Sequence, residues 1–368
     1  MRILYVEPFL GGSHQQWIEG YQRNSRHEIE VIGLPDKFWK WRMLGGAVAL
    51  ADQFNKLRFL PDVIMVSDML DLTTFKSLIN FEGPIVLYFH ENQITYPRSS
   101  EDTDLLIKRD NFYGFVNFTS ALAANEIWFN SQFHYTSFFE ALPGFLNQFP
   151  DYNLAEFVNG IIGKSRVMPL GVDLSGINKI VHSKPKNEAP VLLWNHRWEH
   201  DKNMGLYLES LLKLKDENIP FNLVALGEQR GRKSRDWQVF KDALKDRILH
   251  WGYVDSYSEY IIWLKRSDIL PVTSQHDYFG VSVIEAVYAG CFPILPNALA
   301  YPEHILDEMK PFILYEKGTF YTRLKSVIQR KMYEMDLGDQ QLEIQKYDWN
   351  NMAEEYDEGI EKLSNLYS

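Results

Sequence analysis

The chain contains very little cysteine and no long hydrophobic run. Cys291 is the single cysteine among 368 residues, so no disulfide can form within the chain. Such usage is typical of a reducing compartment. No segment approaches the roughly 20 apolar residues that a membrane span needs. The apolar start, MRILYVEPFLGG, is short and contains Glu7, which predicts a buried strand rather than a signal peptide. These features together predict a cytoplasmic protein.

Low-complexity tracts, heptad arrays and clear internal repeats are also absent, and the remaining composition is ordinary. Hydrophobic residues make up 45% and charged residues 24% of the chain, as in soluble globular proteins. The length predicts about two domains. A net charge of −11 argues against nonspecific coating of nucleic acids or anionic membranes, although it leaves room for a local basic patch.

Short apolar runs alternate with helical patterns along the chain, which predicts parallel sheets covered on both faces. The polar stretch HSKPKNEAP, residues 182–190, reads as a linker between two such domains. We therefore expect an α/β protein with domains at 1–180 and 187–340, and a terminal helix in 341–368 that crosses back to the first domain. The expected strands are Arg2–Val6, Ile29–Leu34, Val63–Ser67, Ile85–Phe89, Ile127–Asn130, Arg166–Leu170, Val191–Asn195, Phe221–Leu226, Ile248–Tyr253, Ile269–Thr273, Phe292–Leu295 and Phe312–Tyr315.

Two motifs of the first domain fall at strand ends, where ligands bind in open parallel sheets. Gly11 and Gly12 precede a predicted helix and would admit an anion at its N-terminus. A plain strand-to-helix turn explains them equally well, and the G-x-G-x-x-G dinucleotide fingerprint is absent. His90 and Glu91 abruptly end an apolar strand, which indicates a site or a locally hydrogen-bonded histidine. No third ligand has a suitable spacing, so we expect no metal.

Two further motifs follow strands of the second domain. Arg197 and Lys202 lie five residues apart in LLWNHRWEHDKN and could hold a diphosphate, unless they are solvated surface charges. Asp277 and Glu285 lie eight residues apart in HDYFGVSVIEAVYAGCFPIL. A helix that begins near Gly280 would offer its free N–H groups to a phosphate. The two carboxylates could then accept hydrogen bonds from hydroxyls of one extended ligand. The alternative is a capping acid and a surface glutamate.

Cations and aromatic residues alternate in KFWKWR, residues 37–42, and more weakly in KRDNFYGF, residues 108–115. Aromatic rings stack on splayed bases while cations meet phosphates, so these segments are candidates for binding single-stranded RNA. KFWKWR also fits a buried amphipathic segment. A third basic cluster, RGRKSR at 230–235, fits a solvated loop at least as well.

These motifs resemble those of a known family. DYFGVSVIEAVYAGCFPIL resembles the acid–seven–Glu motif of retaining GT-B glycosyltransferases, whose first acid is usually Glu. RWEHDKN resembles their Arg…Lys phosphate motif, and MPLGVD at 168–173 their interdomain motif. In the first half, GGSHQQW, KFWKWRM, LYFHENQITYP and KRDNFYGFVNFTSALAANEIWFNS resemble the tRNA-queuosine α-mannosyltransferases. The resemblance implies a GT-B fold, two Rossmann-like domains that face a cleft.

The resemblance also implies a reaction: retaining transfer of mannose from GDP-mannose to the cyclopentenediol of queuosine in a tRNA anticodon, with no cofactor. The implied catalytic residues are His90, Asp277, Arg197 and Lys202. The implied donor-binding residues are Gly11, Gly12, Arg197, Lys202, Phe279, Gly280, Val281 and Glu285, with Glu285 on the ribose and Asp277 on the sugar. The implied acceptor-binding residues are Lys37, Trp39, Lys40, Trp41, Arg42, Glu91, Asn92, Lys108 and Arg109.

Two other functions fit the same residues. A GT-B hexosyltransferase acting on a lipid or small molecule would carry an amphipathic basic helix at the mouth of the cleft, and no strong one is visible. A noncatalytic nucleotide-sugar or RNA-binding protein would have little need of both acids and both phosphate cations.

The sequence departs from the family motif at Asp277, where Glu is usual. Asp is shorter than Glu by one methylene, so the contact of Asp277 with the sugar is less firmly implied than that of Glu285 with the ribose.

Overall fold

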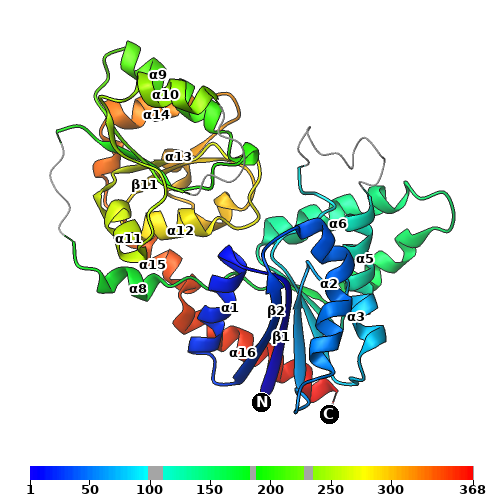
Figure 1. The fold of residues 1–368 in the computed structure, drawn as a ribbon. Helices are drawn as coiled ribbons and strands as arrows, with labels where there is room; N and C mark the ends of the chain where they lie inside the picture. The colour runs from blue at the N-terminus through cyan, green and yellow to red at the C-terminus, as the bar shows by residue number, and fades with distance from the viewer. Residues whose placement is uncertain (98–110, 183–187, 228–234, 368) are drawn as a thin grey trace. The chain divides into compact units, whose positions relative to one another are not determined.

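The computed structural model describes residues 1–97, 111–182, 188–227 and 235–367, which form two compact units (Figure 1). The first unit contains residues 1–171 and 349–368, and the second contains 172–348. The boundary thus lies before the predicted linker at 182–190, because residues 172–182 already belong to the second unit. The terminal segment joins the first unit from Trp349 rather than from residue 341.

The first unit is built on a six-stranded parallel sheet with the order β2-β1-β3-β4-β5-β6. The strand order reverses between β1 and β3, and ligands bind at such a switch point, beyond the carboxyl ends of the strands. The strands are β1 (Arg2–Leu10), β2 (Glu28–Pro35), β3 (Val63–Ser67), β4 (Ile85–Phe89), β5 (Glu126–Phe129) and β6 (Ser165–Val167).

The second unit has its own six-stranded parallel sheet, with the order β12-β11-β10-β7-β8-β9 and a switch point between β7 and β10. The strand predicted at 312–315 is shorter than expected, because Lys310–Ile313 form helix α13 and leave two residues for the strand. The strands are β7 (Val191–Trp194), β8 (Asn222–Ala225), β9 (Ile248–Trp251), β10 (Ile269–Pro271), β11 (Phe292–Pro296) and β12 (Leu314–Tyr315).

Helices cover the sheets, and several begin at a short polar residue whose side chain accepts a backbone N–H. Asp71 caps α3, Ser131 caps α6 and Ser256 caps α11. In the first unit the helices are α1 (Gly12–Asn24), α2 (Trp39–Phe54), α3 (Leu72–Leu78), α5 (Phe112–Ala123), α6 (Gln132–Leu146), α7 (Val158–Ile162) and α16 (Trp349–Leu366). In the second unit they are α8 (Leu174–Lys179), α9 (Met204–Asp216), α10 (Arg235–Ala243), α11 (Tyr257–Arg266), α12 (Val281–Tyr288), α13, α14 (Phe320–Gln329) and α15 (Gly338–Ile344).

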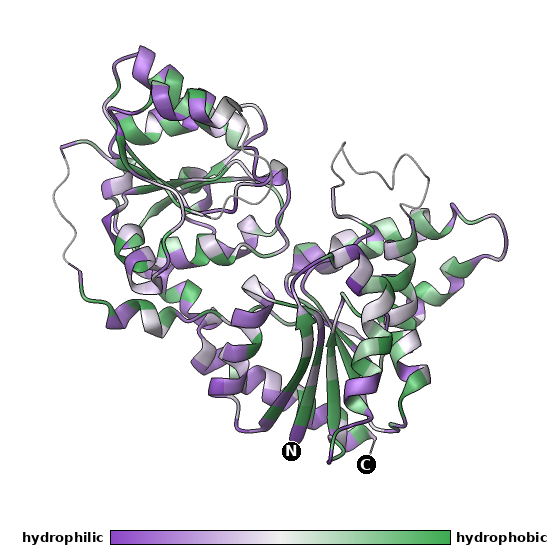
Figure 2. Ribbon diagram, in the orientation of Figure 1, coloured by the Kyte–Doolittle hydropathy of each residue, from purple (hydrophilic) through white to green (hydrophobic). Residues whose placement is uncertain are grey.

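The sheet of the first unit is buried on both faces, because alternate side chains of a strand point to opposite sides. Leu4 and Val6 pack with residues of α2, α3, α5, α6 and α7. Ile3 and Tyr5 pack with residues of α1 and α16. The strands accordingly form hydrophobic ribbons, whereas the helices around them combine hydrophobic and hydrophilic residues (Figure 2). No helix within the described residues combines the length and apolar character needed to cross a bilayer.

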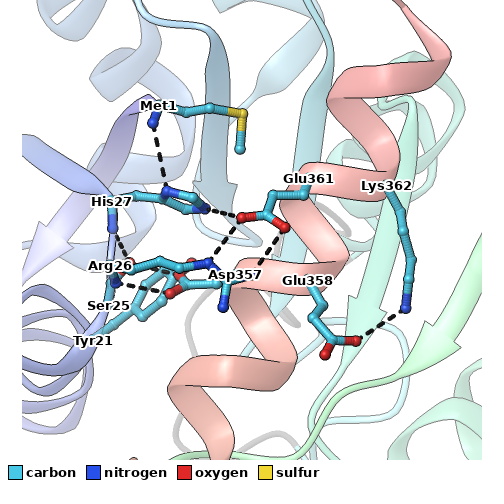
Figure 3. A network of polar contacts seen from close by, with 9 residues as sticks. All are labelled: Met1, Tyr21, Ser25, Arg26, His27, Asp357, Glu358, Glu361 and Lys362. Carbon is cyan, nitrogen blue, oxygen red and sulfur yellow. Dashed lines mark hydrogen bonds and ion pairs between the residues drawn. The ribbon is translucent and has the colours of Figure 1, made fainter.

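Helix α16 returns to the first unit through a buried carboxylate (Figure 3). Asp357 is 2% exposed and accepts hydrogen bonds from the Tyr21 hydroxyl at 2.9 Å, the Ser25 hydroxyl at 2.6 Å and the Arg26 amide at 2.8 Å. One turn further on, Glu361 pairs with the Arg26 guanidinium at 2.9 Å. The last helix is therefore an integral part of the first sheet's packing.

We predict that Asp357→Ala lowers the free energy of unfolding by about 2–3 kcal/mol, because it leaves buried donors without an acceptor. Glu358→Ala is the matched control on the same helix. It removes only an exposed pair with Lys362 at 3.2 Å, which contributes less than about 1 kcal/mol. Urea unfolding of both variants measures the difference. Equal effects would contradict the assigned role of Asp357.

Candidate functional site

Polar residues of the second unit gather beyond β7 and β10, at the switch point of that sheet. Lys202 ends a short 3-10 helix, His200–Lys202, and is 9% exposed. Its ammonium donates to the His276 carbonyl at 2.9 Å and pairs with Asp277 at 3.3 Å and Asp201 at 3.1 Å. Two predicted residues, Lys202 and Asp277, are thus directly joined, and Asp201 is a partner that the sequence motif did not reveal.

The ion cluster keeps its charged groups ionised. Burial alone would lower the pKa of Lys202, but the carboxylates of Asp277 and Asp201 raise it above its ordinary value. Burial alone would raise the pKa of Asp277, but the Lys202 ammonium and the Tyr301 hydroxyl, at 3.1 Å, hold it below its ordinary value. His196 lies beside them, and burial together with Lys202 lowers its pKa to about 4, so it is neutral.

Helix α12 begins next to this cluster, as predicted near Gly280. Gly280 is its N-cap and has φ 91°, a left-handed conformation in which a Cβ would also lie 3.0 Å from the Tyr301 ring. The Phe279 amide is directed at the Asp277 carboxylate at 3.4 Å. The first N–H groups of a helix have no acceptor within the helix, so the start of α12 can receive an anion.

Glu285 lies on α12 and is half-buried. Its carboxylate accepts a hydrogen bond from the Tyr260 hydroxyl at 2.8 Å. Burial raises the pKa of Glu285 to about 7, while the bond from Tyr260 acts in the opposite direction. Asn195, at the end of β7, donates to the Tyr260 hydroxyl at 3.3 Å and to the Ser282 carbonyl at 2.7 Å. The Ser282 hydroxyl contacts His196 at 2.9 Å, which connects Glu285 with the lysine cluster.

Arg197 differs from Lys202 in its surroundings. Its side chain is 53% exposed and lies 3.5 Å from Glu199. Its positive charge is near enough to Lys202 to lower the pKa of that lysine. The structure thus brings Arg197, Lys202 and Asp277, which were predicted to act together, to one end of the second sheet. It also separates a buried cation, Lys202, from an accessible one, Arg197.

The first unit has a polar cluster at its own switch point, built around a residue that was not assigned a role from sequence. Glu7 is fully buried on β1. It accepts hydrogen bonds from Tyr5, His14 and Ser67 and from the Phe9 amide, each at 2.9 Å. Burial alone would lower the pKa of His14, but Glu7 raises it to about 9. His14 is therefore an imidazolium at neutral pH.

His90 lies directly against this ion pair. Its ring packs against His14 with centroids 4.4 Å apart and planes tilted by 31°, and its Nε2 is 3.3 Å from the Tyr5 hydroxyl. Burial and the charge of His14 hold the pKa of His90 well below its ordinary value, so it is neutral. Asp68 is fully buried behind it and accepts the His90 amide at 2.8 Å. Burial raises the pKa of Asp68 well above its usual range, and Glu91 adds to that effect.

The other residues predicted around this cluster have different roles. A Cβ on Gly11 would lie 2.3 Å from the Asp36 carboxyl carbon, so a larger residue here would have to displace the Asp36 side chain. Gly12 has φ 54° and open space before it, which leaves an approach to the N-terminus of α1. Asn92 is fully buried, and its amide oxygen accepts the amides of Ile94 and Thr95. Asn92 thus shapes the turn that follows Glu91, and its contact with the acceptor stays a prediction.

The segment KFWKWR is neither wholly buried nor wholly exposed. Phe38 is 77% and Trp41 63% exposed, whereas Trp39 packs on Tyr113 with ring centroids 5.2 Å apart. Lys37 is exposed, Lys40 lies 5.6 Å from the Trp39 ring centre, and Arg42 donates to the Pro35 carbonyl at 3.2 Å. Phe112, at the start of α5, is 50% exposed. We call Phe38, Trp41 and Phe112 the aromatic surface.

Lys108 and Arg109, and the basic residues at 230–233, lie outside the described residues. Within the described ranges, no group of three or more His, Cys, Asp or Glu side chains is placed to hold a metal ion.

Comparisons with known proteins place these features in a family. Residues 2–172 match the family model for the N-terminal part of tRNA-queuosine alpha-mannosyltransferase, and residues 177–336 match the model for glycosyl transferases group 1. A tRNA-queuosine alpha-mannosyltransferase of Drosophila melanogaster is 31% identical over 348 residues, which cover 90% of this chain and 86% of that protein. The chain belongs to the tRNA-queuosine alpha-mannosyltransferase family.

Solved structures confirm the predicted GT-B fold of two parallel-sheet domains. A sucrose-phosphate synthase of Thermosynechococcus elongatus covers all of both chains with a TM-score of 0.75 at 12% identity. Anabaena HepE in complex with UDP covers 98% of this chain and 100% of its own, with a TM-score of 0.67 at 14% identity.

The sequence motifs did not reveal several residues of the two polar clusters. Glu7 interrupts an apolar strand, which was the available signal for a buried, paired acid. Asp201 lies inside RWEHDKN, between the two cations that drew attention. His14 and Tyr260 carried no local signal, because their partners, Glu7 and Glu285, meet them only through the fold.

We predict that the Glu7–His14 pair makes stability depend on pH. The pKa of His14 rises from 6.5 to about 9 on folding, so its contribution is complete below pH 6.5 and is lost as the pH rises to 9. Burial alone would raise the pKa of Glu7, but its partners lower it, so this contribution is lost only in acid. The alkaline loss corresponds to about 3 kcal/mol.

Urea unfolding of wild type and Glu7→Gln at pH 6, 7.5 and 9 measures this effect. The destabilisation caused by Glu7→Gln should be largest at pH 6 and should shrink toward pH 9. The control is Glu30→Gln, which changes an exposed acid on β2 and should show no such trend. A destabilisation of Glu7→Gln that is constant over this range would refute the ion pair.

Proposed function

We propose that this chain transfers mannose from GDP-mannose to queuosine in a tRNA anticodon, with retention of configuration. Family membership supports the choice of acceptor and sugar, because the Drosophila relative is named for mannosyl transfer to tRNA-queuosine. The nucleotide is a proposal that rests on the resemblance of the motifs. The cation-rich switch point of the second unit supports a diphosphate ligand there, whatever its base.

The second unit would bind the donor. Arg197, Lys202 and the start of α12 offer positive charge and N–H groups for the diphosphate. Asp277 would accept hydrogen bonds from the sugar and Glu285 from the ribose. Lys202 pairs with Asp277 in the present structure, so we expect the bound donor to divide that pair, with the phosphate taking the ammonium and the sugar the carboxylate.

The first unit would bind the acceptor. Neutral His90 can exchange hydrogen bonds with a hydroxyl of the sugar or of queuosine, and the imidazolium of His14 beside it keeps His90 neutral. The aromatic surface would stack on unpaired anticodon bases while Lys37 and its neighbours meet phosphates. The local patch reconciles RNA binding with a net charge of −11.

The reaction breaks the bond between the sugar C1 and the phosphate oxygen and forms a bond from C1 to the queuosine hydroxyl oxygen. We propose that the acceptor attacks on the side that the leaving group departs from, and that the departing phosphate takes the hydroxyl proton. Negative charge grows on the diphosphate during this step. Arg197, Lys202 and the α12 N-terminus would stabilise it in place of a metal cofactor.

The decisive experiment incubates the protein with queuosine-containing tRNA and, separately, GDP-mannose, GDP-glucose, UDP-glucose and UDP-galactose. Mass analysis of nucleosides should show one hexose on queuosine with GDP-mannose alone. The same tRNA with guanosine in place of queuosine is the acceptor control. Arg197→Ala, at an exposed position, should keep the fold and lower kcat roughly 10²-fold. Absence of any hexose would overturn the proposal and favour a lipid or small-molecule acceptor, whereas transfer from another donor would overturn GDP-mannose only.

The aromatic surface makes a second prediction. Phe38→Ala and Trp41→Ala should each raise the KM for tRNA about tenfold, because one stacked base contributes about 1–3 kcal/mol. The KM for the donor should not change. Val48→Ala is the matched control, since Val48 is 56% exposed on the same helix and carries no ring. Steady-state kinetics with a tRNA series measures this, and an unchanged KM for tRNA in both aromatic variants would rule out stacking.

A further inference from the structure

Tyr260 makes a short hydrogen bond to Glu285, and nothing in the motifs assigns it a role. It lies on α11 and donates its hydroxyl to the Glu285 carboxylate on α12 at 2.8 Å. Burial and the nearby charge of Glu285 hold the pKa of Tyr260 well above its ordinary value. The hydroxyl therefore stays protonated and remains a donor throughout the range in which the carboxyl group titrates.

The contact is itself held in place from the sheet. Asn195 is 7% exposed at the end of β7, and its amide donates both to the Tyr260 hydroxyl and to the Ser282 carbonyl in the first turn of α12. The other atom of this amide, Oδ1, is buried and has no hydrogen-bond partner among the described residues. One side chain thus connects Tyr260, the helix start and the strand end.

Tyr260 also matters because Glu285 changes between its protonated and ionised forms near neutral pH. The groups that shift the pKa of this carboxyl are the hydroxyl of Tyr260 and the carboxylate of Asp173, which caps α8. The nearby Tyr257 is affected by the charge of Glu285 but is not among the groups that shift its pKa. Burial raises the pKa of Glu285 to about 7, the hydrogen bond from Tyr260 lowers it, and Asp173 raises it. An ionised carboxylate accepts both hydroxyls of a ribose, whereas a protonated one must use an oxygen as donor.

We propose that Tyr260 is a positioning residue, which orients the Glu285 carboxylate toward the ribose hydroxyls of the bound nucleotide and is itself held by Asn195. This inference rests on the proposed function, because it takes the ribose contact of Glu285 as given. Tyr260 acts through Glu285, so removing its hydroxyl should weaken nucleotide binding only while Glu285 is present. Rings of the same size at position 260 preserve the packing, which separates orientation from folding.

The test is calorimetric binding of GDP, with UDP and ADP in parallel, to wild type, Tyr260→Phe, Glu285→Gln and the double variant. Tyr257→Phe is the matched control: it removes a hydroxyl from the same helix, at a 44% exposed residue whose ring centroid is 6.2 Å from that of Tyr260. Thermal unfolding of every variant verifies the fold. No step requires turnover or tRNA.

At pH 8, Tyr260→Phe should bind GDP about tenfold more weakly than wild type, which is about 1.4 kcal/mol. Tyr257→Phe should bind like wild type. The double variant should bind like Glu285→Gln within about twofold, because coupled residues are not additive. A Tyr260→Phe variant that binds like wild type, or a fully additive double variant, would overturn the inference while leaving the proposed function intact.

The pH dependence supplies a readout that a purely structural role would not move. Wild-type affinity should fall between pH 8 and pH 6 as Glu285 takes up a proton. The pH dependence of binding to Glu285→Gln comes from the titration of GDP itself, and it is subtracted from that of wild type. Loss of the Tyr260 bond removes an influence that lowers the pKa of Glu285, so the midpoint in Tyr260→Phe should move to higher pH. An unmoved midpoint would contradict the proposal, and wild type that binds none of the three nucleotides would overturn the proposed function with it.

Discussion

A charge removed from water must be paired or surrounded by hydrogen-bond donors, and both units meet this constraint at the carboxyl ends of their sheets. In the first unit, the fully buried Glu7 is satisfied by His14 and three other donors. In the second, Lys202 is enclosed by Asp201 and Asp277. Each pairing fixes the ionisation of a neighbouring histidine: His90 stays neutral beside His14, and His196 stays neutral beside Lys202.

The two clusters differ in which polar groups they leave accessible to a ligand. In the first unit, the Glu7 carboxylate is used completely by hydrogen bonds within its own fold, and the neutral ring of His90 lies beside it. In the second unit, Arg197 is half-exposed and Glu285 titrates near neutrality. The second unit therefore combines an accessible cation and a carboxyl group that titrates near neutrality with a buried ion pair, Lys202 with Asp277. This division agrees with a family whose members share the second-domain motifs with many sugar-transferring enzymes.

Helix α16 shows how the first unit depends on residues from the far end of the chain. Asp357 and Trp349 complete the face of the sheet that also carries Tyr5 and Trp17. The same face supports the Glu7 side chain through Tyr5. The Glu7 cluster is thus held by packing that extends through a helix more than 330 residues away in sequence.

The α/β class, the parallel sheets and the strand ends were predictable from sequence, because buried parallel strands are continuous apolar runs and their termination in polar residues is local. Asp277, Lys202 and Gly280 could be picked out for the same reason. The sequence could not predict that Asn92 faces inward, that Trp39 packs while Trp41 is exposed, or that Phe312 belongs to a helix. The direction in which a side chain points, toward the core or toward solvent, depends on what packs against its helix or strand. Nor could it join Glu7 with His14 or Glu285 with Tyr260, because such pairs form only when distant elements are brought to one edge of a sheet. The sequence by itself determined which chemistry is present, and the tertiary structure decided which charges are buried, paired or free to meet a ligand.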